Sequence, residues 1–383
     1  MNFEFATAGR IVFGRGTSRQ VPALARDLGR RAFVVLSEAG RGREALARGL
    51  EDAGVHPVFF HAGGEPTTHL VDRATEVARA ETCDLVIAQG GGSVIDAGKA
   101  VAGLLANPGK ALDYLEVVGG GRPLLNPGVP LVAVPTTAGT GTEVTRNSVL
   151  DVPEHKVKVS LRSHHLLARV AVVDPELTVS LPPEVTAFTG LDALTQLIEP
   201  LVCNATTPLT DGVCREGLPR AARSLEKAYR DGSDIDARED MALAALCGGI
   251  ALANARLGAV HGFAGVLGGV TGQAHGAICA RLLPFVMETN IRAVEERGNA
   301  ATTGRYLEVA RILTNDREAN VRDGVSWVRR VCAELRIPTL RDAGLSAADC
   351  DRIVPLARRA SSMRGNPVEL SDAELRGILE AAL

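Results

Sequence analysis

The sequence has few aromatic residues and almost no net charge. Aromatic side chains make up 3% of its 383 residues, and the formal net charge is −3. Proteins that bind single-stranded nucleic acids need aromatic side chains on which bases stack, and duplex binders need a basic surface. These two absences exclude a nucleic-acid partner.

Paired cysteines and long apolar runs are also missing. The seven cysteines are scattered along the chain and form no CxxC pair, which is typical of free thiols in a reducing compartment. No run reaches the roughly 18 uncharged apolar residues of a membrane span. The opening MNFEFATAGR has no apolar segment of the signal-peptide type. We therefore expect a cytoplasmic protein without a membrane partner.

Lysine is scarce, because only five of the 42 cationic residues are lysine. Those five are Lys99, Lys110, Lys156, Lys158 and Lys227. The compact ammonium group of lysine differs from the planar guanidinium of arginine. In a chain that otherwise uses arginine we expect lysine where that shape is needed, and Lys99 and Lys158 are the candidates.

The pattern of apolar residues divides the chain into two parts. Apolar runs of strand type alternate with helical periodicity in the first part, and this alternation is typical of a parallel sheet covered by helices on both faces. From residue 181 onward nearly every segment has helical periodicity. We predict an α/β domain over residues 1–180 and an all-helical domain over 181–383. The expected strands lie at 10–14, 32–37, 56–62, 84–89 and 130–137, and the expected helices between them at 43–54, 70–81 and 96–106.

Two loops that follow strands have the composition of a nucleotide site. GGGSVIDAGK begins at Gly90, and glycines at a strand-to-helix junction let a phosphate approach the first N–H groups of the helix. PTTAGTGTE begins at Pro135 and offers short hydroxyl groups for ribose and amide hydrogen bonds. Ligands of open α/β sheets bind at the carboxyl ends of neighbouring strands. Neither loop is GxGxxG, so the ordinary dinucleotide fingerprint is absent.

The helical part contains a candidate metal site. His261 and His275 lie fourteen residues apart in an apolar segment, and Asp192 lies in the equally apolar stretch GLDALTQLIEP, residues 190–200. Gln196 and Glu199 share a helical face with Asp192. A single histidine of this kind is usually a core residue. Two imidazoles and a carboxylate together form a set that holds divalent metals.

Four motifs together resemble the iron-containing alcohol dehydrogenase family: GGGSVIDAGK, PTTAGTGTE, GLDALTQLIEP and HGFAGVLGGVTGQAHGAICARLLP. VVDPEL (172–177) and RGNPVEL (364–370) extend the resemblance over essentially the whole chain. It implies the dehydroquinate-synthase-like, iron-containing alcohol dehydrogenase fold, with an α/β dinucleotide-binding domain containing a parallel sheet and an all-helical C-terminal domain.

The resemblance also implies roles for individual residues. Asp192, His261 and His275 are expected to be catalytic as metal ligands, and the fourth ligand position falls on Gln196. The expected cofactor-binding residues are Ser37, Gly90, Gly91, Gly92, Ser93, Asp96, Thr136, Thr137, Thr140, Gly141 and Lys158. Among these, the glycines and Ser93 fall on the pyrophosphate loop, and the threonines with Gly141 fall on the nicotinamide loop.

The sequence departs from the family pattern at two positions near the expected metal. The family usually has histidine where this chain has Gln196, and often a second histidine where this chain has Gly265. An amide oxygen binds hard cations acceptably but transition metals less well than imidazole does. The glycine removes a candidate proton carrier and leaves space beside the reacting centre.

Ser37 bears on the choice between NAD and NADP. NAD-preferring members have aspartate at this position, where a carboxylate binds the ribose 2′-hydroxyl and repels a 2′-phosphate. Serine does not repel a 2′-phosphate, so NADP(H) is permitted, with Arg41 or Arg43 as partners of that phosphate. The neighbouring Glu38 supplies a carboxylate, so NAD(H) is permitted as well.

We therefore expect an NAD(P)-dependent alcohol dehydrogenase or aldehyde reductase with Fe²⁺ as its metal, Zn²⁺ being an alternative. A metal-free reductase of the maleylacetate-reductase type and an NAD-dependent lyase of the dehydroquinate-synthase-like superfamily are the other readings of the same motifs. The partners expected are a small alcohol or aldehyde and a second copy of the chain in a homodimer. The particular alcohol and the physiological direction stay open.

Overall fold

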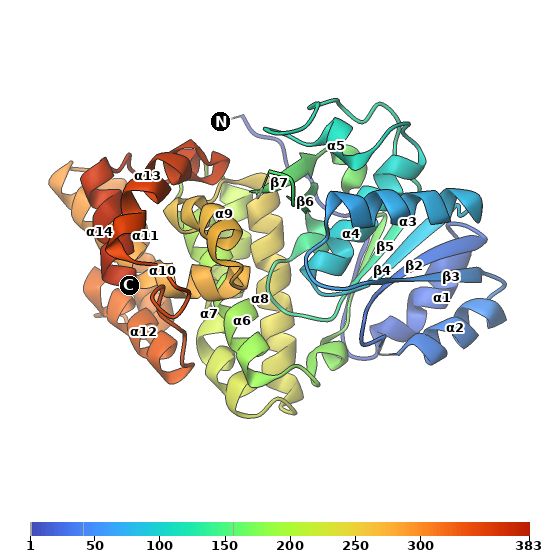
Figure 1. Cartoon of the computed structure of the whole chain (residues 1–383). Helices are drawn as coiled ribbons and strands as arrows, with labels where there is room; N and C mark the ends of the chain where they lie inside the picture. Colours follow the sequence, from blue (N-terminus) through green and yellow to red (C-terminus); the bar gives the residue numbers. More distant parts are fainter. Residues whose placement is uncertain (1, 41, 156) are drawn as a thin grey trace. The chain divides into compact units, whose positions relative to one another are not determined.

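The computed structural model describes residues 2–40, 42–155 and 157–383, which form two compact units (Figure 1). The α/β unit contains the described residues of Ala6–Thr137 and Gly141–Thr178. The helical unit contains residues 2–5, Ala138–Thr140 and Val179–Leu383. Arg41, one of the two expected phosphate partners, lies outside the described residues. The domain boundary at 180/181 stays a prediction, because compactness does not show that either part folds independently.

The α/β unit is built on a six-stranded sheet in which every pairing is parallel. The strand order is β1-β8-β5-β4-β2-β3. The five strands expected from apolar runs are all present, and β8 is a sixth that its short length concealed. The strands are β1 (Ile11–Phe13), β2 (Arg31–Ser37), β3 (His56–Ala62), β4 (Leu85–Gly90), β5 (Leu131–Pro135) and β8 (Val170–Val173).

Helices cover both faces of this sheet (Figure 1). Alternate residues of β2, such as Val34 and Leu36, pack with α1 and α2 in one apolar cluster, because successive strand side chains point to opposite faces. Helix α4 packs on the other face, where Gly98 lies directly against Ala88 of β4. The helices are α1 (Val21–Arg26), α2 (Arg43–Asp52), α3 (Thr68–Ala80), α4 (Gly92–Leu105) and the short α5 (Ala111–Tyr114).

An antiparallel hairpin, β6 (Asn147–Val152) with β7 (Val157–Arg162), was not expected from the sequence. Lys99 of α4 is fully buried, and its Nζ donates hydrogen bonds to Thr142 Oγ1 (2.8 Å), Thr145 Oγ1 (2.9 Å) and the Asn147 carbonyl (2.8 Å). Burial lowers the pKa of Lys99 to about 8 despite the neighbouring Asp96 carboxylate. This scarce lysine therefore ties α4 to the start of the hairpin.

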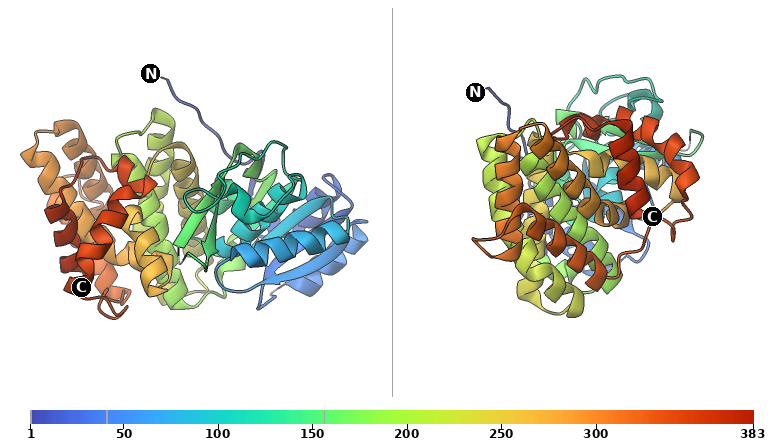
Figure 2. Two further views of the ribbon diagram at one scale, coloured as in Figure 1. Left: turned by 45° about the horizontal axis from the view of Figure 1, so that its top comes forward. Right: turned by 90° about the vertical axis from the view of Figure 1, so that its left-hand side faces the viewer.

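The helical unit is built around α6, which runs from Pro183 to Val202. Its first residue is a proline, whose fixed φ suits the first turn of a helix and whose missing N–H is not needed there. Figure 2 shows α6, α7 and α8 (green to yellow) running side by side. The remaining helices are α7 (Pro208–Arg230), α8 (Ile235–Asn254), α9 (Ala259–Thr271), α10 (His275–Glu296), α11 (Ala300–Thr314), α12 (Val321–Glu334), α13 (Cys350–Arg359) and α14 (Asp372–Ala382).

The length and hydropathy of the helices bear on whether any of them could cross a membrane. Among the described residues, no single helix is long and apolar enough to cross a membrane. Helices α8 and α9 meet the length and composition requirement only as a pair, which is bent by 98°.

Candidate metal centre

Helix α6 presents three polar side chains on one buried face. Asp192, Gln196 and Glu199 are spaced by four and three residues, so each lies about one turn beyond the last. Asp192 and Gln196 are only 2% exposed. A carboxylate and an amide in the core of a helical bundle need partners, because burying such groups unpaired costs several kcal/mol.

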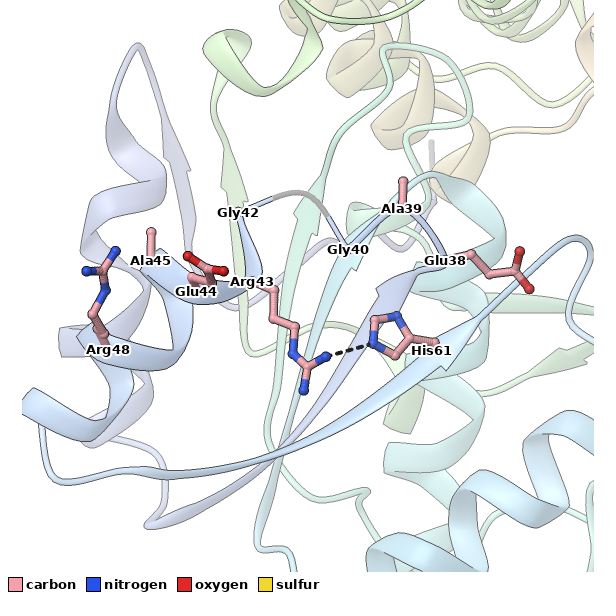
Figure 3. A pocket seen from close by; sticks show the side chains of 9 residues that line it. All are labelled: Glu38, Ala39, Gly40, Gly42, Arg43, Glu44, Ala45, Arg48 and His61. Carbon is pink, nitrogen blue, oxygen red and sulfur yellow. Dashed lines mark hydrogen bonds between the residues drawn. The ribbon is translucent and has the colours of Figure 1, made fainter.

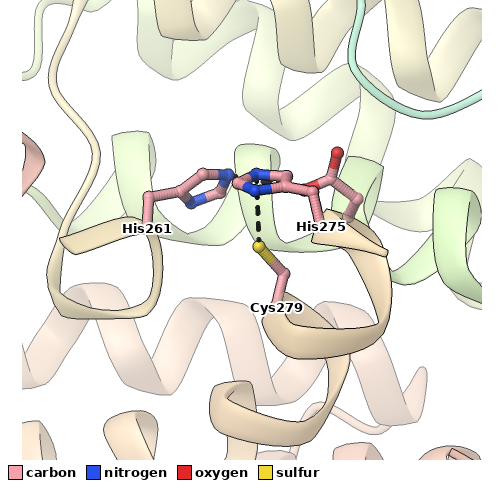
Figure 4. Close-up of side chains that lie close together, drawn as sticks. His261, His275 and Cys279 are labelled. Atoms are coloured by element: carbon pink, nitrogen blue, oxygen red, sulfur yellow. Dashed lines mark hydrogen bonds and ion pairs between the residues drawn. The ribbon is translucent and has the colours of Figure 1, made fainter. Parts of the chain in front are cut away.

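Two histidines reach this face from other helices. His261 lies in the first turn of α9, and His275 is the first residue of α10. Their side chains point toward one another, together with the sulfur of Cys279 one turn further along α10 (Figure 4). One ligand atom from each of Asp192, His261, His275 and Cys279 lies within 4.8 Å of the others. The structure thus brings together three of the four ligands expected from the sequence, Asp192, His261 and His275, and adds Cys279.

Several buried polar atoms of this region lack hydrogen-bond partners among the described residues. Asp192 Oδ1, His261 Nε2 and Gln196 Oε1 are buried and form no hydrogen bond within the described chain. Asp192 Oδ1 lies 3.4 Å from His261 Nε2 and 3.9 Å from His275 Nε2. Buried polar atoms are nearly always paired, and exceptions in one cluster point to a ligand that completes the pairing. A divalent metal would be such a ligand, because a carboxylate and two imidazoles are groups that bind one.

Glu199 fixes the orientation of His261. Its Oε2 lies 2.7 Å from His261 Nδ1, and its Oε1 accepts a hydrogen bond from the Val260 N–H (2.8 Å). A proton held on Nδ1 leaves the lone pair of Nε2 directed into the cluster, which is the arrangement of metal-bound histidines. We assigned Glu199 no role from the sequence, although its position seven residues after Asp192 was a usable signal.

The Gln196 amide contacts Asp192 rather than a histidine. Its Nε2 donates a hydrogen bond to Asp192 Oδ2 over 3.0 Å. This bond holds the second carboxylate oxygen and leaves Oδ1 turned toward the two imidazoles.

The charges of the cluster shift its pKa values. Burial alone would raise the pKa of Asp192, but its interactions with His261 and His275 lower that pKa overall. Burial alone would lower the pKa of His261, whereas Cys279 and the bonds with Asp192 and Glu199 raise it well above the usual range. Cys279 and Asp192 likewise raise the pKa of His275 to about 9. Protons therefore compete with a metal for the imidazoles, and metal binding must strengthen as the pH rises.

The two expected cofactor loops are neighbours in the α/β unit. Strands β4 and β5 pair in parallel, and the Gly90 carbonyl accepts a hydrogen bond from the Thr136 N–H (2.9 Å). Helix α4 begins at Gly92, so its first N–H groups, including that of Ser93, lie at this edge. An added Cβ on Gly91 would make an ordinary contact with the Thr137 side chain at 3.5 Å, so the two loops lie side by side.

Four other expected cofactor residues are placed differently. Asp96 accepts hydrogen bonds from Thr142 Oγ1 (2.6 Å) and the Val149 N–H (3.1 Å), which anchors the hairpin. Lys158 Nζ lies 3.1 Å from Glu65 Oε1. Thr140 belongs to the helical unit, whereas Gly141 begins the second segment of the α/β unit with a positive φ of 58°.

A pocket of about 760 Å³ lies beyond Ser37, at the end of β2. Strand β2 pairs with β4, so this pocket is at the same edge of the sheet as the two loops. Arg43 extends toward His61 inside it, and Glu38 points away from Arg43 (Figure 3). The lining residues are Glu38, Ala39, Gly40, Gly42, Arg43, Glu44, Ala45, Arg48 and His61.

Comparison with known proteins gives consistent results for both parts of the chain. Residues 8–175 match the family described as iron-containing alcohol dehydrogenase, and residues 186–383 match the C-terminal region of the Fe-containing alcohol dehydrogenase family. The chain is 32% identical to choline dehydrogenase of Bacillus subtilis over 97% of its length and 92% of that protein's. It is 34% identical to 4-hydroxybutyrate dehydrogenase of Cupriavidus necator over 94% and 92%.

Solved structures agree with this assignment. A 1,3-propanediol oxidoreductase superposes with a TM-score of 0.93 at 30% identity, covering 100% of both chains. The iron-containing alcohol dehydrogenase of Thermotoga maritima superposes with a TM-score of 0.84 at 26% identity, covering 100% of this chain and 99% of the other. The expected fold is thereby confirmed.

These results also confirm the expected activity, because the relatives are oxidoreductases that act on CH–OH groups. Enzymes of this kind use NAD(P) and a divalent metal, typically Fe²⁺, and this chain has both a nucleotide-type sheet edge and a cluster of candidate ligands. The chain belongs to the iron-containing alcohol dehydrogenase family.

Proposed function

We propose that the chain transfers a hydride between C4 of NAD(P) and the carbinol carbon of a primary alcohol or its aldehyde, at a metal held by Asp192, His261 and His275. The convergence of unpartnered buried atoms, Asp192 Oδ1 and His261 Nε2, carries this proposal. A divalent metal supplies Lewis-acid polarisation of the substrate oxygen when it is bound. The nicotinamide supplies the hydride chemistry, and the protein supplies position and charge.

The residues around the cluster divide the remaining tasks. Asp192 supplies the negative charge, Glu199 keeps the lone pair of His261 Nε2 directed inward, and Gln196 holds Asp192 Oδ2. Gly265 offers no proton carrier, and among the described residues an added Cβ there would meet no atom within 4 Å. The hydroxyl proton of the alcohol therefore leaves through water in our proposal. Gly262 adds no further room, because it packs against Met363.

The proposal predicts that a chelator abolishes turnover and that Fe²⁺ or Zn²⁺ restores it. The measurement is NAD(P)H oxidation with a short aldehyde, alongside metal quantification of protein purified under mild conditions. Full activity after chelation, with metal far below one ion per chain, would support the metal-free reductase instead.

For the cofactor, we propose that NADP(H) is accepted and that Arg43 binds its 2′-phosphate. Arg43 lines the pocket next to Ser37, and its guanidinium stacks on Phe59 at 4.7 Å from the ring centre. Glu38, the group that favours NAD(H), lines the same pocket, with its carboxylate next to Gly63. A guanidinium held in place by an aromatic ring is well suited to a phosphate.

Arg43→Ala should raise the KM for NADPH by about tenfold or more, since a charge-assisted bond contributes about 1.5–3 kcal/mol. The KM for NADH should stay nearly constant. Arg73→Ala is the matched control, because Arg73 stacks on the neighbouring Phe60 at 5.8 Å without lining the pocket. Equal effects of Arg43→Ala on both cofactors would refute phosphate recognition by this residue.

The substrate class is proposed from the relatives. Choline, 4-hydroxybutyrate and 1,3-propanediol, named for three of them, are all primary alcohols. We also propose a cytoplasmic homodimer. Sedimentation of the purified protein tests the dimer.

A further inference from the structure

Cys279 is the group of the metal centre to which the sequence gave no role. It lies one turn after His275 on α10 and is completely buried. Its Sγ is 3.6 Å from His275 Nε2, and it lies within 4.8 Å of the ligand atoms of Asp192 and His261 as well. Burial does not distinguish it, because all seven cysteines are buried and free. Its neighbours distinguish Cys279 from the other six cysteines, because they are the metal ligands proposed above.

Three of the six separations among the four ligand atoms are close to those between neighbouring ligands of one metal ion. Metal–ligand distances of about 2.0–2.3 Å place tetrahedral ligand atoms roughly 3.3–3.7 Å apart. The observed separations are 3.4 Å for Asp192–His261, 3.6 Å for His275–Cys279 and 3.9 Å for Asp192–His275. The other three separations are at most 4.8 Å, so the four atoms surround a common centre.

Gln196 is engaged in a different way. Its Nε2 donates a hydrogen bond to Asp192 Oδ2, so the amide holds this carboxylate, while its Oε1 is buried without a hydrogen-bond partner in the described chain. The chain therefore has an amide where its family resemblance places a ligand, and a thiol at the same cluster from another helix.

We infer that the Cys279 thiolate is the fourth protein ligand of the metal and that Gln196 is a positioning residue for Asp192. This inference rests on the metal centre of the proposed function and specifies its donor set. Coordination forms a metal–sulfur bond and releases the thiol proton to solvent. A thiolate is a soft donor, so the site should favour Zn²⁺ over Fe²⁺ more strongly than an all-nitrogen-and-oxygen set would.

Cobalt substitution tests the inference directly. Co²⁺-loaded wild-type protein should show a sulfur-to-cobalt charge-transfer band in the near ultraviolet, in addition to the visible d–d bands of the bound ion. Cys279→Ser should lose the charge-transfer band and keep d–d bands. Cys332→Ser is the matched control, because that buried thiol bonds to the Ala280 carbonyl beside Cys279 (3.3 Å), and it should keep both bands. Gln196→Ala should keep the charge-transfer band.

The outcomes separate this inference from the proposed function. Visible d–d bands without a charge-transfer band in the wild type would overturn sulfur ligation and leave the metal centre in place. Failure to bind one Co²⁺ per chain would overturn the metal centre itself. Zinc affinity, measured by competition with a chromophoric chelator, should fall by about 100-fold or more in Cys279→Ser, since even groups that only orient ligands contribute about 10–100-fold.

Discussion

Asp192→Asn is expected to lower kcat/KM for the alcohol by about 1000-fold, or roughly 4 kcal/mol of transition-state stabilisation. Asp192 is the carboxylate that joins both imidazoles, with Oδ1 at 3.4 Å from His261 and 3.9 Å from His275. Asparagine keeps the shape but removes the charge that offsets a divalent cation. Steady-state rates and metal content per chain are the measurements.

A second buried aspartate provides the control for Asp192→Asn. Asp211 is paired with Arg305 at 2.9 and 3.0 Å in the same helical unit, away from the four-residue cluster. Asp211→Asn should lower thermal stability while leaving the metal content intact. If Asp192→Asn kept full metal content and wild-type rate, Asp192 would not be a ligand.

Glu199→Gln is expected to weaken metal binding by about 10–100-fold, the usual cost of losing a group that orients a ligand. The carboxylate lies 2.7 Å from His261 Nδ1 and so favours, in the neutral ring, the tautomer with its proton on Nδ1 and its lone pair on Nε2. An amide can present its NH₂ group to Nδ1 instead, which favours the tautomer with its proton on Nε2, inside the cluster. Metal affinity by competition titration is the primary readout.

Tyr306→Phe is the control for Glu199→Gln. Tyr306 is buried nearby, and its hydroxyl accepts a hydrogen bond from Asn290 Nδ2 (3.1 Å) without contacting a histidine of the cluster. Its loss should affect stability more than metal affinity. Equal losses of metal affinity in both variants would indicate general loosening of the core, and would remove the orienting role from Glu199.

The metal centre shows how far local sequence signals extend. Asp192, His261 and His275 could be named in advance, because their residue types, spacing and motifs all point to ligands. Cys279 could not, although it lies four residues after His275, since a buried cysteine in a helix is usually only a small apolar group. Its role depends on its distance from α6 and α9, which the sequence of α10 does not contain.

The sheet edge that contains the two expected cofactor loops also has features that local sequence signals do not predict. The glycine and threonine loops were recognisable, because a strand-to-helix junction with those residues has few other uses. Asp96 and Lys99 were placed correctly on the first turns of α4, yet their side chains bond to the segment around Thr142 and to the hairpin. Their partners are distant in the sequence: Thr142, for example, lies 43 residues after Lys99.

By itself, the sequence determined the parallel α/β architecture, the helical second half, the two nucleotide loops and three candidate ligands. These features depend on periodicity and residue type within short segments, which local physical chemistry governs. Only the tertiary structure decided that Glu199 supports His261, that Gln196 bonds to Asp192 and that Cys279 joins the cluster. Each of these depends on where a side chain of one helix meets another, and such meetings follow from the packing of the whole bundle.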